Sequence, residues 1–310
     1  MRICSIGECM VELNSSKHNS YNLTFAGDTG NTAVYLSRLG AKTYYLTSIG
    51  KDKLSNRMEE FLQKEKISNK FIFKNPKKNI GLYLIENNKF GERNFYYWRS
   101  DSAAKYLFDN IKINSFVKLF NNINVVYFSG ITLSIYNDRN LQRFYNFIKL
   151  LKKNNTTICI DINARLTNWK SKEYAVKILK KFIKISDMLF FTEEDLKILK
   201  IKNVNLFVKN NTNKKSLKVY RKGNGQVTVF SANESRKFNL QLNKKVIDTT
   251  GCGDAFDAGM ITALAKDIDL EASLKFATAT SGLVATGLGS DAGIISYEDT
   301  IQKMENFKIK

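Results

Sequence analysis

The sequence predicts an α/β fold, a three-layer core with a mainly parallel central sheet, to which a small β-sheet is added. The first observation is that short apolar runs alternate with amphipathic stretches of helical periodicity along the chain. The second is that two polar–aromatic, strand-like segments interrupt this alternation. Because alternating strands and helices build βαβ units, whose helices cover both faces of a parallel sheet, the alternation defines the core.

The elements of the core follow one another in a regular order. Strand-like and helix-like segments take turns as ICSIGE (3–8), NTAVYLSRLG (31–40), KTYYLTSIG (42–50), KLSNRMEEFLQKE (53–65), VVYFSG (125–130), NLQRFYNFIKLLKK (140–153), TTICID (156–161), EYAVKILKKFIK (173–184) and DMLFFT (187–192). The β-branched and aromatic residues of the short runs favour strands, and apolar positions three or four apart favour helices in the longer ones.

Two segments that do not fit the alternation, residues 14–26 and 79–99, are predicted to form the added β-layer. The second carries a turn signal, Asn87-Asn88, between two strand-like arms. The chain has no internal repeat and no linker rich in proline and glycine. We therefore expect a single domain over residues 1–310 with a discontinuous β-lid.

Composition excludes several classes of protein. The chain has 310 residues, of which 43% are apolar and 12% aromatic, enough for a substantial core. The apolar N-terminus is interrupted by Glu8 and Glu12 and carries no cleavage signal or bilayer-spanning run, so we expect a cytoplasmic protein with no membrane partner. His18 is the only histidine, which removes serine–histidine and cysteine–histidine nucleophiles and histidine metal clusters.

The net charge of +20 raises the question of a nucleic-acid partner. The lysines are scattered, often beside asparagines, and form no long basic block, so we interpret them as a solvated surface and expect no nucleic acid. A positive field still favours the capture of small anions. The four cysteines contain no CxxC pair and are expected to be reduced.

The segment DTTGCGDAFDAGM, residues 248–260, is the most informative stretch. Apolar positions at helical spacing follow Gly253, so a glycine loop enters a helix and Asp254 lies in its first turn. N–H groups there lack intrahelical partners and bind anions, while a carboxylate beside them accepts a proton from an attacking hydroxyl. The pattern favours phosphoryl transfer; the alternative is a glycine turn whose acidic residue complements the helix dipole. Asp257 is either a second catalytic carboxylate or, as we expect, an exposed or capping residue.

A second glycine loop, FAGDTGNTAVYLSRLG at residues 25–40, precedes the first helix. Gly27 and Gly30 allow close approach of the backbone, while Asp28 and Asn31 offer short polar side chains suited to vicinal hydroxyls. By itself this segment is also consistent with a capped helix N-terminus. Together with the C-terminal loop it indicates a polyol held at one end and a phosphate donor at the other.

These two glycine loops, in a chain of this length, resemble the ribokinase-like carbohydrate kinases of the PfkB family, and the resemblance covers essentially the whole chain. Within the family, GECMVEL, GERNFYYWR and DINARLTNW are most similar to the branch that phosphorylates 2-keto-3-deoxygluconate. The resemblance implies an α/β core with a β-lid and ATP-dependent phosphorylation of the terminal hydroxyl of this sugar acid, to give 2-keto-3-deoxy-6-phosphogluconate.

The resemblance also implies roles for individual residues. Asp254 is the expected catalytic base, with an anion hole formed by the backbone of Gly251, Cys252 and Gly253. The residues expected to contact the sugar are Gly27, Asp28, Asn31, Tyr83, Tyr97, Arg99, Arg165 and Asp254. Because two arginines in a closing pocket need an anionic partner, we expect Arg99 and Arg165 to bind the carboxylate of a sugar acid.

ATP, Mg²⁺ and a monovalent cation are the cofactors that the resemblance implies. The residues expected near ATP are Lys222, Gly223, Gly225, Gly251, Gly253, Ala277 and Ser281. The residue that orients Mg²⁺ through water is left open between Glu194 and Asp195 of the segment TEED. Asp248 and Thr250 match positions that bind a monovalent cation in some members, and capping of the loop is the alternative.

Three other functions stay open at this point. The nearest is a kinase for a neutral sugar such as fructose or ribose, and the next is a non-catalytic regulator that binds a sugar or nucleotide on the same fold. An RNA-binding protein is the third. Pairing of lid strands in the family implies a homo-oligomer formed through the lid.

Overall fold

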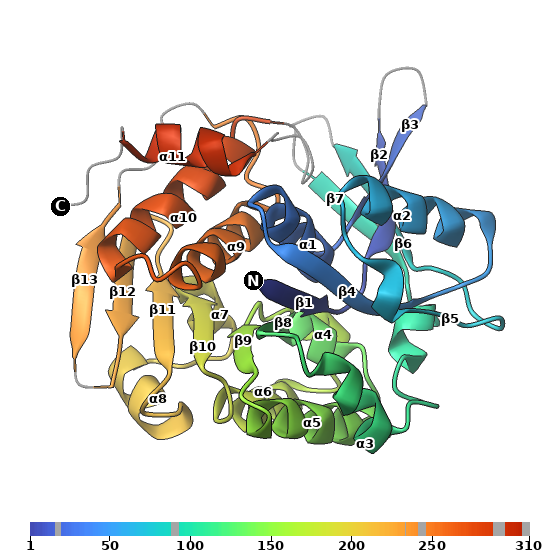
Figure 1. The fold of residues 1–310 in the computed structure, drawn as a ribbon, viewed down its shortest axis with the longest axis horizontal. Helices are drawn as coiled ribbons and strands as arrows, with labels where there is room; N and C mark the ends of the chain where they lie inside the picture. The colour runs from blue at the N-terminus through green and yellow to red at the C-terminus, as the bar shows by residue number, and fades with distance from the viewer. Residues whose placement is uncertain (16–19, 88–92, 233, 241–245, 288–294, 306–310) are drawn as a thin grey trace.

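The computed structural model describes residues 1–15, 20–87, 93–232, 234–240, 246–287 and 295–305. Within these ranges a nine-stranded central sheet has the order β13-β12-β11-β10-β9-β8-β1-β4-β5 (Figure 1). Its strands are β1 (Arg2–Ile6), β4 (Lys42–Ile49), β5 (Ile72–Lys74), β8 (Val125–Ser129), β9 (Thr157–Asp161), β10 (Met188–Thr192), β11 (Leu217–Arg221), β12 (Gln226–Phe230) and β13 (Ser235–Asn239).

The seven strands from β11 to β5 in this order pair in parallel, and β12 and β13 continue the sheet as an antiparallel edge. Helices cover both faces, which confirms the predicted α/β fold. One face packs against α1 (Asp28–Arg38), α2 (Lys53–Lys64), α9 (Cys252–Leu264), α10 (Leu270–Val284) and α11 (Tyr297–Glu305). The other packs against α3 (Ile113–Phe116), α4 (Gly130–Ser134), α5 (Asp138–Lys153), α6 (Lys172–Ile183), α7 (Glu193–Ile198) and α8 (Val204–Asn211).

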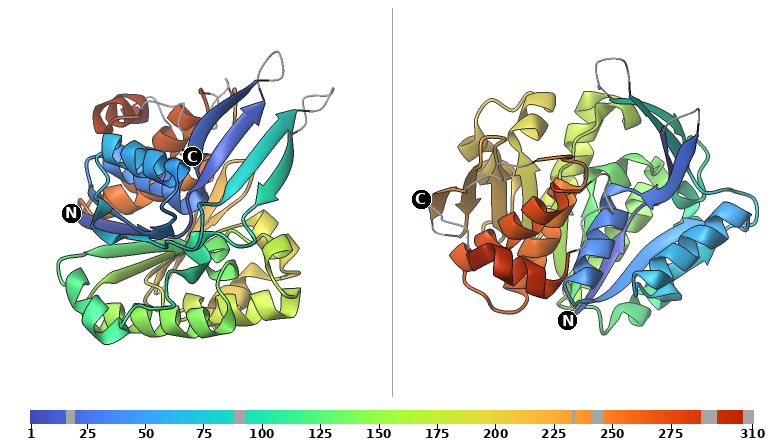
Figure 2. Two further views of the ribbon diagram at one scale, coloured as in Figure 1. Left: turned by 90° about the vertical axis from the view of Figure 1, so that its right-hand side faces the viewer. Right: turned by 90° about the horizontal axis from the view of Figure 1, so that it is seen from above.

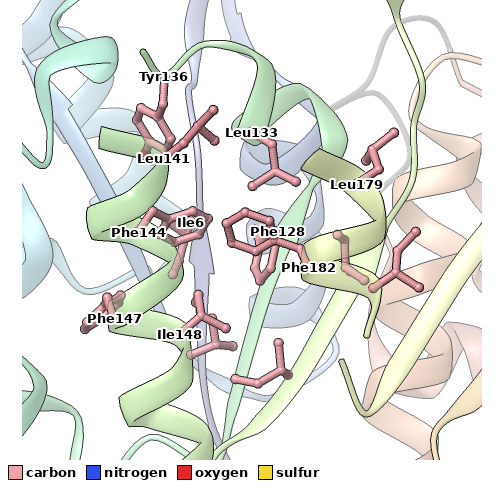
Figure 3. Close-up of a cluster of buried hydrophobic side chains, with 14 of the residues drawn as sticks. Ile6, Phe128, Leu133, Tyr136, Leu141, Phe144, Phe147, Ile148, Leu179 and Phe182 are labelled. Atoms are coloured by element: carbon pink, nitrogen blue, oxygen red, sulfur yellow. The ribbon is translucent and has the colours of Figure 1, made fainter. Parts of the chain in front are cut away.

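The larger core lies between the sheet and α5 and α6, and it is rich in phenylalanine. The ring of Phe144 from α5 lies 5.0 Å from that of Phe128 on β8 and 5.5 Å from that of Phe182 on α6 (Figure 3). All three side chains are almost completely buried, so this contact fixes two helices against the middle of the sheet.

A second sheet of the described residues has the order β3-β2-β6-β7 and projects from one end of the core (Figure 2). Its strands are β2 (Met10–Ser15), β3 (Tyr21–Ala26), β6 (Leu82–Asn87) and β7 (Arg93–Trp98). They overlap the ranges 14–26 and 79–99 expected for a lid, and the sheet begins earlier, at Met10. Asn88 of the expected turn lies outside the described residues.

The topology places the C-terminal ends of β8, β9, β10 and β11 at one edge of the central sheet, as parallel strands require. Open parallel sheets bind ligands at this edge. α1 begins at Asp28, three residues before the expected helix, so the glycine loop leads directly into its first turn. Among the described residues, none of the helices has both the length and the apolar character needed to span a bilayer.

Candidate active site

A cavity of about 660 Å³ lies between the second sheet and the C-terminal edge of the central sheet. Its wall combines segments far apart in the sequence, including the glycine loops before α1 and α9 and the last residues of β9, β10 and β11. All the residues expected to contact a sugar line it: Gly27, Asp28, Asn31, Tyr83, Tyr97, Arg99, Arg165 and Asp254.

Asp254 lies in the first turn of α9, which follows Gly251 at a φ of 76°, in the left-handed region that favours glycine. The Asn31 amide donates to Asp254 Oδ2 at 2.8 Å and so joins the first turns of α1 and α9. Asp254 is 9% exposed, and burial, together with the charge of Asp28, raises its pKa well above the usual value for aspartate. A buried carboxyl of raised pKa that lines a cavity is suited to accept a proton.

The backbone that precedes Asp254 provides fewer free donors than expected. The N–H of Cys252 donates to the carbonyl of Thr249 at 3.2 Å, so it is already engaged. Gly253 lies in the first turn of α9, where helix geometry supplies no partner for its N–H. Gly251 and Gly253 line the cavity whereas Cys252 does not, so the N–H groups of these two glycines remain as candidate hydrogen-bond donors to an anion.

Asp28, the first residue of α1, is fixed through both oxygens. The backbone N–H of Thr29 donates to Oδ1 at 2.8 Å, and the Asn163 amide donates to Oδ2 at 3.1 Å. Burial raises the pKa of this carboxyl as well. Before it, Gly27 leaves no room for a side chain, because an added Cβ would lie 2.3 Å from the carbonyl oxygen of Glu8.

Aromatic side chains of the second sheet form one wall of the cavity. The ring of Tyr83 stacks on that of Tyr97 with centroids 5.7 Å apart, and Phe95 lies 6.3 Å from Tyr97. Tyr83 donates its hydroxyl to the Glu12 carboxylate, so that hydroxyl is not free for a ligand. Tyr97 is 55% exposed and keeps its hydroxyl available.

The two expected carboxylate-binding arginines differ in their surroundings. Arg99 forms an ion pair with Glu8, a residue that sequence reasoning did not assign to the site and that is 4% exposed. Arg165 is half exposed and lies 3.9 Å from the still more exposed carboxylate of Glu194, a loose contact. Arg99 therefore already has an anionic partner within the protein, whereas Arg165 has only a loose one.

Arg221, at the end of β11, is a second site residue that the sequence analysis missed. Its guanidinium lies 3.0 Å from Asp257 and 3.7 Å from Asp161, and its Nη1 donates to the carbonyl of Gly253 at 3.2 Å. It also lies over the ring of Phe256, 4.9 Å from the centroid. The only signal in the sequence was its place next to Lys222, which was expected near ATP.

Asp257 has neither of the two roles considered from the sequence. It is completely buried, pairs with Arg221 and accepts a hydrogen bond from the Tyr127 hydroxyl at 3.1 Å. It does not line the cavity. Burial raises its pKa and Arg221 opposes the rise. Asp257 therefore holds the guanidinium in place from within the core.

A second cavity, of about 540 Å³, adjoins the first and contains most of the residues expected near a nucleotide. Lys222, Gly223, Gly225, Gly253 and Ser281 line it, whereas the expected Gly251 lines the first cavity instead. The expected Ala277 does not line it, because this residue is fully buried against α9, where an added Cβ on Gly259 would lie 2.7 Å from its Cα. The two cavities share four lining residues: Thr192, Glu194, Arg221 and Gly253.

The acidic residues expected to interact with metals are used differently. Asp195 accepts from the N–H of Ala164 at 2.7 Å and from both donors of Thr192, in a capping box, so its oxygens are engaged. Glu194 lines both cavities and remains the candidate for Mg²⁺. Asp248 Oδ1 accepts from the N–H and the hydroxyl of Thr250, both at 2.8 Å, as in a capped loop. Within the described residues, no three acidic, cysteine or histidine side chains form a cluster suited to a metal ion.

Comparisons with known proteins agree with this geometry. The model of the pfkB family carbohydrate kinases matches residues 1–296. A 2-dehydro-3-deoxygluconokinase of Dickeya dadantii is 32% identical over 269 residues, which cover 84% of this chain and 86% of that protein. The crystal structure of a 2-dehydro-3-deoxygluconokinase from Thermotoga maritima superposes with a TM-score of 0.84 at 22% identity, covering 98% of this chain and 99% of that one. A fructokinase from Xylella fastidiosa with bound ATP has a TM-score of 0.87 at 17% identity, covering 98% of each chain.

The buried pair between Arg221 and Asp257 can be tested by unfolding. Asp257→Ala leaves the guanidinium of Arg221 with only the more distant Asp161, so we expect the free energy of unfolding to fall by about 3–5 kcal/mol, the usual cost of removing one partner of a buried pair. Asp267→Asn, in the exposed turn that follows α9, is the control and should change it by less than about 0.5 kcal/mol. Denaturant titration measures both, and equal stability of the two variants would contradict the assignment.

Proposed function

The chain belongs to the pfkB family of carbohydrate kinases, and we propose that it transfers the γ-phosphoryl group of ATP to the terminal hydroxyl of 2-keto-3-deoxygluconate, also called 2-dehydro-3-deoxygluconate. The observation that carries this proposal is the position of Asp254. Its buried carboxyl lies beside the N–H donors of a glycine loop, in the wall of one cavity and next to a second cavity. Phosphoryl transfer to a hydroxyl requires a proton acceptor and, beside it, hydrogen-bond donors that bind the phosphate anion.

In the proposed reaction Asp254 accepts the proton of the sugar hydroxyl as its oxygen attacks the phosphoryl group. The N–H groups of Gly251 and Gly253 and the guanidinium of Arg221 balance the negative charge at the junction of the cavities. Asn31 keeps Asp254 oriented toward the cavity through its 2.8 Å hydrogen bond. These residues come from α1, β11 and α9, which the core holds together.

The second cavity fits a nucleotide. Gly223 borders open space, since an added Cβ there would meet nothing within 4 Å, and Lys222 and Ser281 supply polar groups. We propose that ATP binds here with its phosphates toward Gly253, where it supplies the phosphoryl group. Mg²⁺ would be held by those phosphates and, through water, by Glu194, because oxygen ligands are the ones it prefers. A monovalent cation has no support beyond the resemblance, because Asp248 caps its own loop.

The choice of a sugar acid rests on the relatives and on Arg165. Relatives named 2-dehydro-3-deoxygluconokinase match most of the chain at about one-third identity. Arg165, loosely placed at 3.9 Å from Glu194, is available for a carboxylate. The pairing of Arg99 with Glu8 is the observation that favours the second candidate, a kinase for a neutral sugar, since it leaves one arginine rather than two for an acid. The intact Gly251–Asp254 segment argues against a non-catalytic regulator.

We also propose that the single domain, residues 1–310, closes its second sheet over the sugar as a lid and pairs through this sheet with a second copy. Tyr83 and Tyr97 on one face of the sheet line the cavity, which supports contact with the ligand. Tyr96 and Trp98 are the neighbours of Tyr97 along β7 and are 46% and 60% exposed, which supports an interface on the other face.

The role of Asp254 predicts a specific defect in Asp254→Asn. The amide cannot accept the proton, so turnover should fall about 10²- to 10⁴-fold while binding of ATP changes little. Asp267→Asn makes the same charge change in the turn that follows α9 and should keep normal turnover. Steady-state rates with 2-keto-3-deoxygluconate and calorimetric binding of ATP test this, and turnover near the wild-type rate in Asp254→Asn would contradict the role.

The hydrogen bond from Asn31 predicts a shift in the pH dependence. Activity should fall as the pH drops through the raised pKa of Asp254, because the protonated carboxyl cannot accept a proton. The Asn31 amide lowers this pKa, so Asn31→Ala should raise it further and move the acidic limb of the pH profile of kcat to higher pH. Asn121→Ala, at an exposed position, is the control. A limb that stays in place, or moves to lower pH, would show that another group controls it.

The different environments of the two arginines predict different substrate effects. Arg165→Ala should lower kcat/KM for the sugar acid by about 30-fold, the loss of one charge-assisted hydrogen bond, and leave any neutral sugar unaffected. Arg99→Ala strands Glu8, so it should lower kcat/KM for acid and neutral sugars alike. A panel of sugars and sugar acids with product identification provides the measurement. Equal losses for both classes in Arg165→Ala would favour the neutral-sugar kinase.

A further inference from the structure

Glu8 is a buried carboxylate in the wall of the sugar cavity with one oxygen unused. It lies between β1 of the core and β2 of the second sheet and is 4% exposed. One oxygen, Oε2, pairs with Arg99, whereas the buried Oε1 has no hydrogen-bond partner among the described residues. Buried carboxylate oxygens almost always have a partner, so this one calls for a donor from outside the chain.

The backbone around Glu8 makes room for this oxygen. An added Cβ on Gly81 would lie 2.6 Å from Oε1, so a side chain at that position would displace the carboxylate. The N–H of Val11 holds Gly81 in place by donating to its carbonyl at 2.9 Å. The nearby tyrosine hydroxyl, that of Tyr83, is already donated to Glu12. The Tyr136 hydroxyl, a buried donor influenced by the charge of Glu8, makes no hydrogen bond to it either. Glu8 itself lines the cavity, so a bound ligand is the remaining source of a donor for Oε1.

We propose that Glu8 is a substrate-binding residue whose Oε1 accepts a hydrogen bond from a hydroxyl of the bound sugar. The proposal rests on the proposed function, because it takes the cavity to be the sugar site. A carboxylate accepts hydrogen bonds and donates none, so its partner must carry a proton, as a sugar hydroxyl does. A hydrogen bond to a charged acceptor is among the stronger ones, so it discriminates between substrates that have and lack the hydroxyl.

Arg99 makes this recognition possible without binding the substrate carboxylate itself. Its guanidinium balances the charge of Glu8, which keeps Glu8 a charged acceptor within a buried wall. A substrate carboxylate brought beside Glu8 would be repelled by it. The arrangement therefore assigns the Glu8 side of the cavity to a hydroxyl and leaves Arg165 for the carboxylate of a sugar acid.

The experiment combines Glu8→Gln with substrates that lack single hydroxyls. The amide of glutamine keeps the size of Glu8 and a hydrogen-bond acceptor for Arg99, and removes the charge. The substrates are 2-keto-3-deoxygluconate, its 4-deoxy and 5-deoxy analogues and its C4 epimer. In the wild type, loss of the hydroxyl that Glu8 binds should lower kcat/KM by about 30- to 100-fold, and in Glu8→Gln by less than about 10-fold.

Glu86→Gln on β6 is the matched control, because it removes a carboxylate from the neighbouring second sheet, outside the cavity. It should keep the wild-type discrimination, and thermal melts confirm that all variants fold. A Glu8 that only holds Arg99 would lower kcat/KM for every substrate by the same factor, which would overturn the proposal. A wild type that phosphorylates the parent sugar acid but discriminates against no analogue would overturn it too. A wild type that phosphorylates neutral sugars alone, or no sugar, would overturn the proposed function instead, together with this inference.

Discussion

The structure depends on the charge balance around one guanidinium. Arg221 lies between Asp161 and Asp257, and the carboxyls of Asp28 and Asp254 follow at the same edge of the sheet. Burial raises the pKa of all four acids, and repulsion by a neighbouring carboxylate adds to the rise at Asp161, Asp254 and Asp257. Without a cation among them, this end of the core would disfavour the ionised state that a proton acceptor needs. The hydrogen bond from Arg221 to the carbonyl of Gly253 ties the same cation to the loop that carries Asp254. The contacts of Arg221 therefore serve both the stability of the core and the ionisation of the carboxyls in the site.

Much of the fold, and about half of the site, could be predicted because the signals are local. The strands of the parallel sheet are continuous apolar runs, and the helices carry apolar positions at helical spacing, so periodicity alone places them. The two glycine loops are also local, since a helix N-terminus after glycine offers N–H donors whatever lies around it. These signals correctly placed Asn31 and Asp254 in one cavity although 223 residues separate them.

The rest could not be predicted, because it depends on which distant side chains meet. Asp257 shares a helix with Asp254, and helical spacing does not say that its side is the one covered by β11 and Arg221. Glu8 and Arg99 are 91 residues apart. In the sequence, Glu8 is only a charge that interrupts a strand and Arg99 only a cation for a ligand, and their pairing depends on the position of the second sheet. Asp195 lines the first cavity, yet a capping box engages its oxygens, and a close helix crossing buries Ala277 away from the second cavity.

Under the proposed function, sugar and nucleotide would contact the same four residues, which line both cavities, so the binding of each would depend on the other. If bound nucleotide raises the affinity for the sugar by some factor, bound sugar must raise the affinity for the nucleotide by the same factor. Under the proposed reaction, the coupling between the two ligands becomes unfavourable after the transfer. The phosphorylated product would carry its new charge onto the donors of Gly253 and Arg221 that the next γ-phosphate requires. Unphosphorylated sugar and ATP would therefore bind at the same time, whereas the phosphorylated product and ATP would compete for the same hydrogen-bond donors. The product would then have to leave before the next ATP binds.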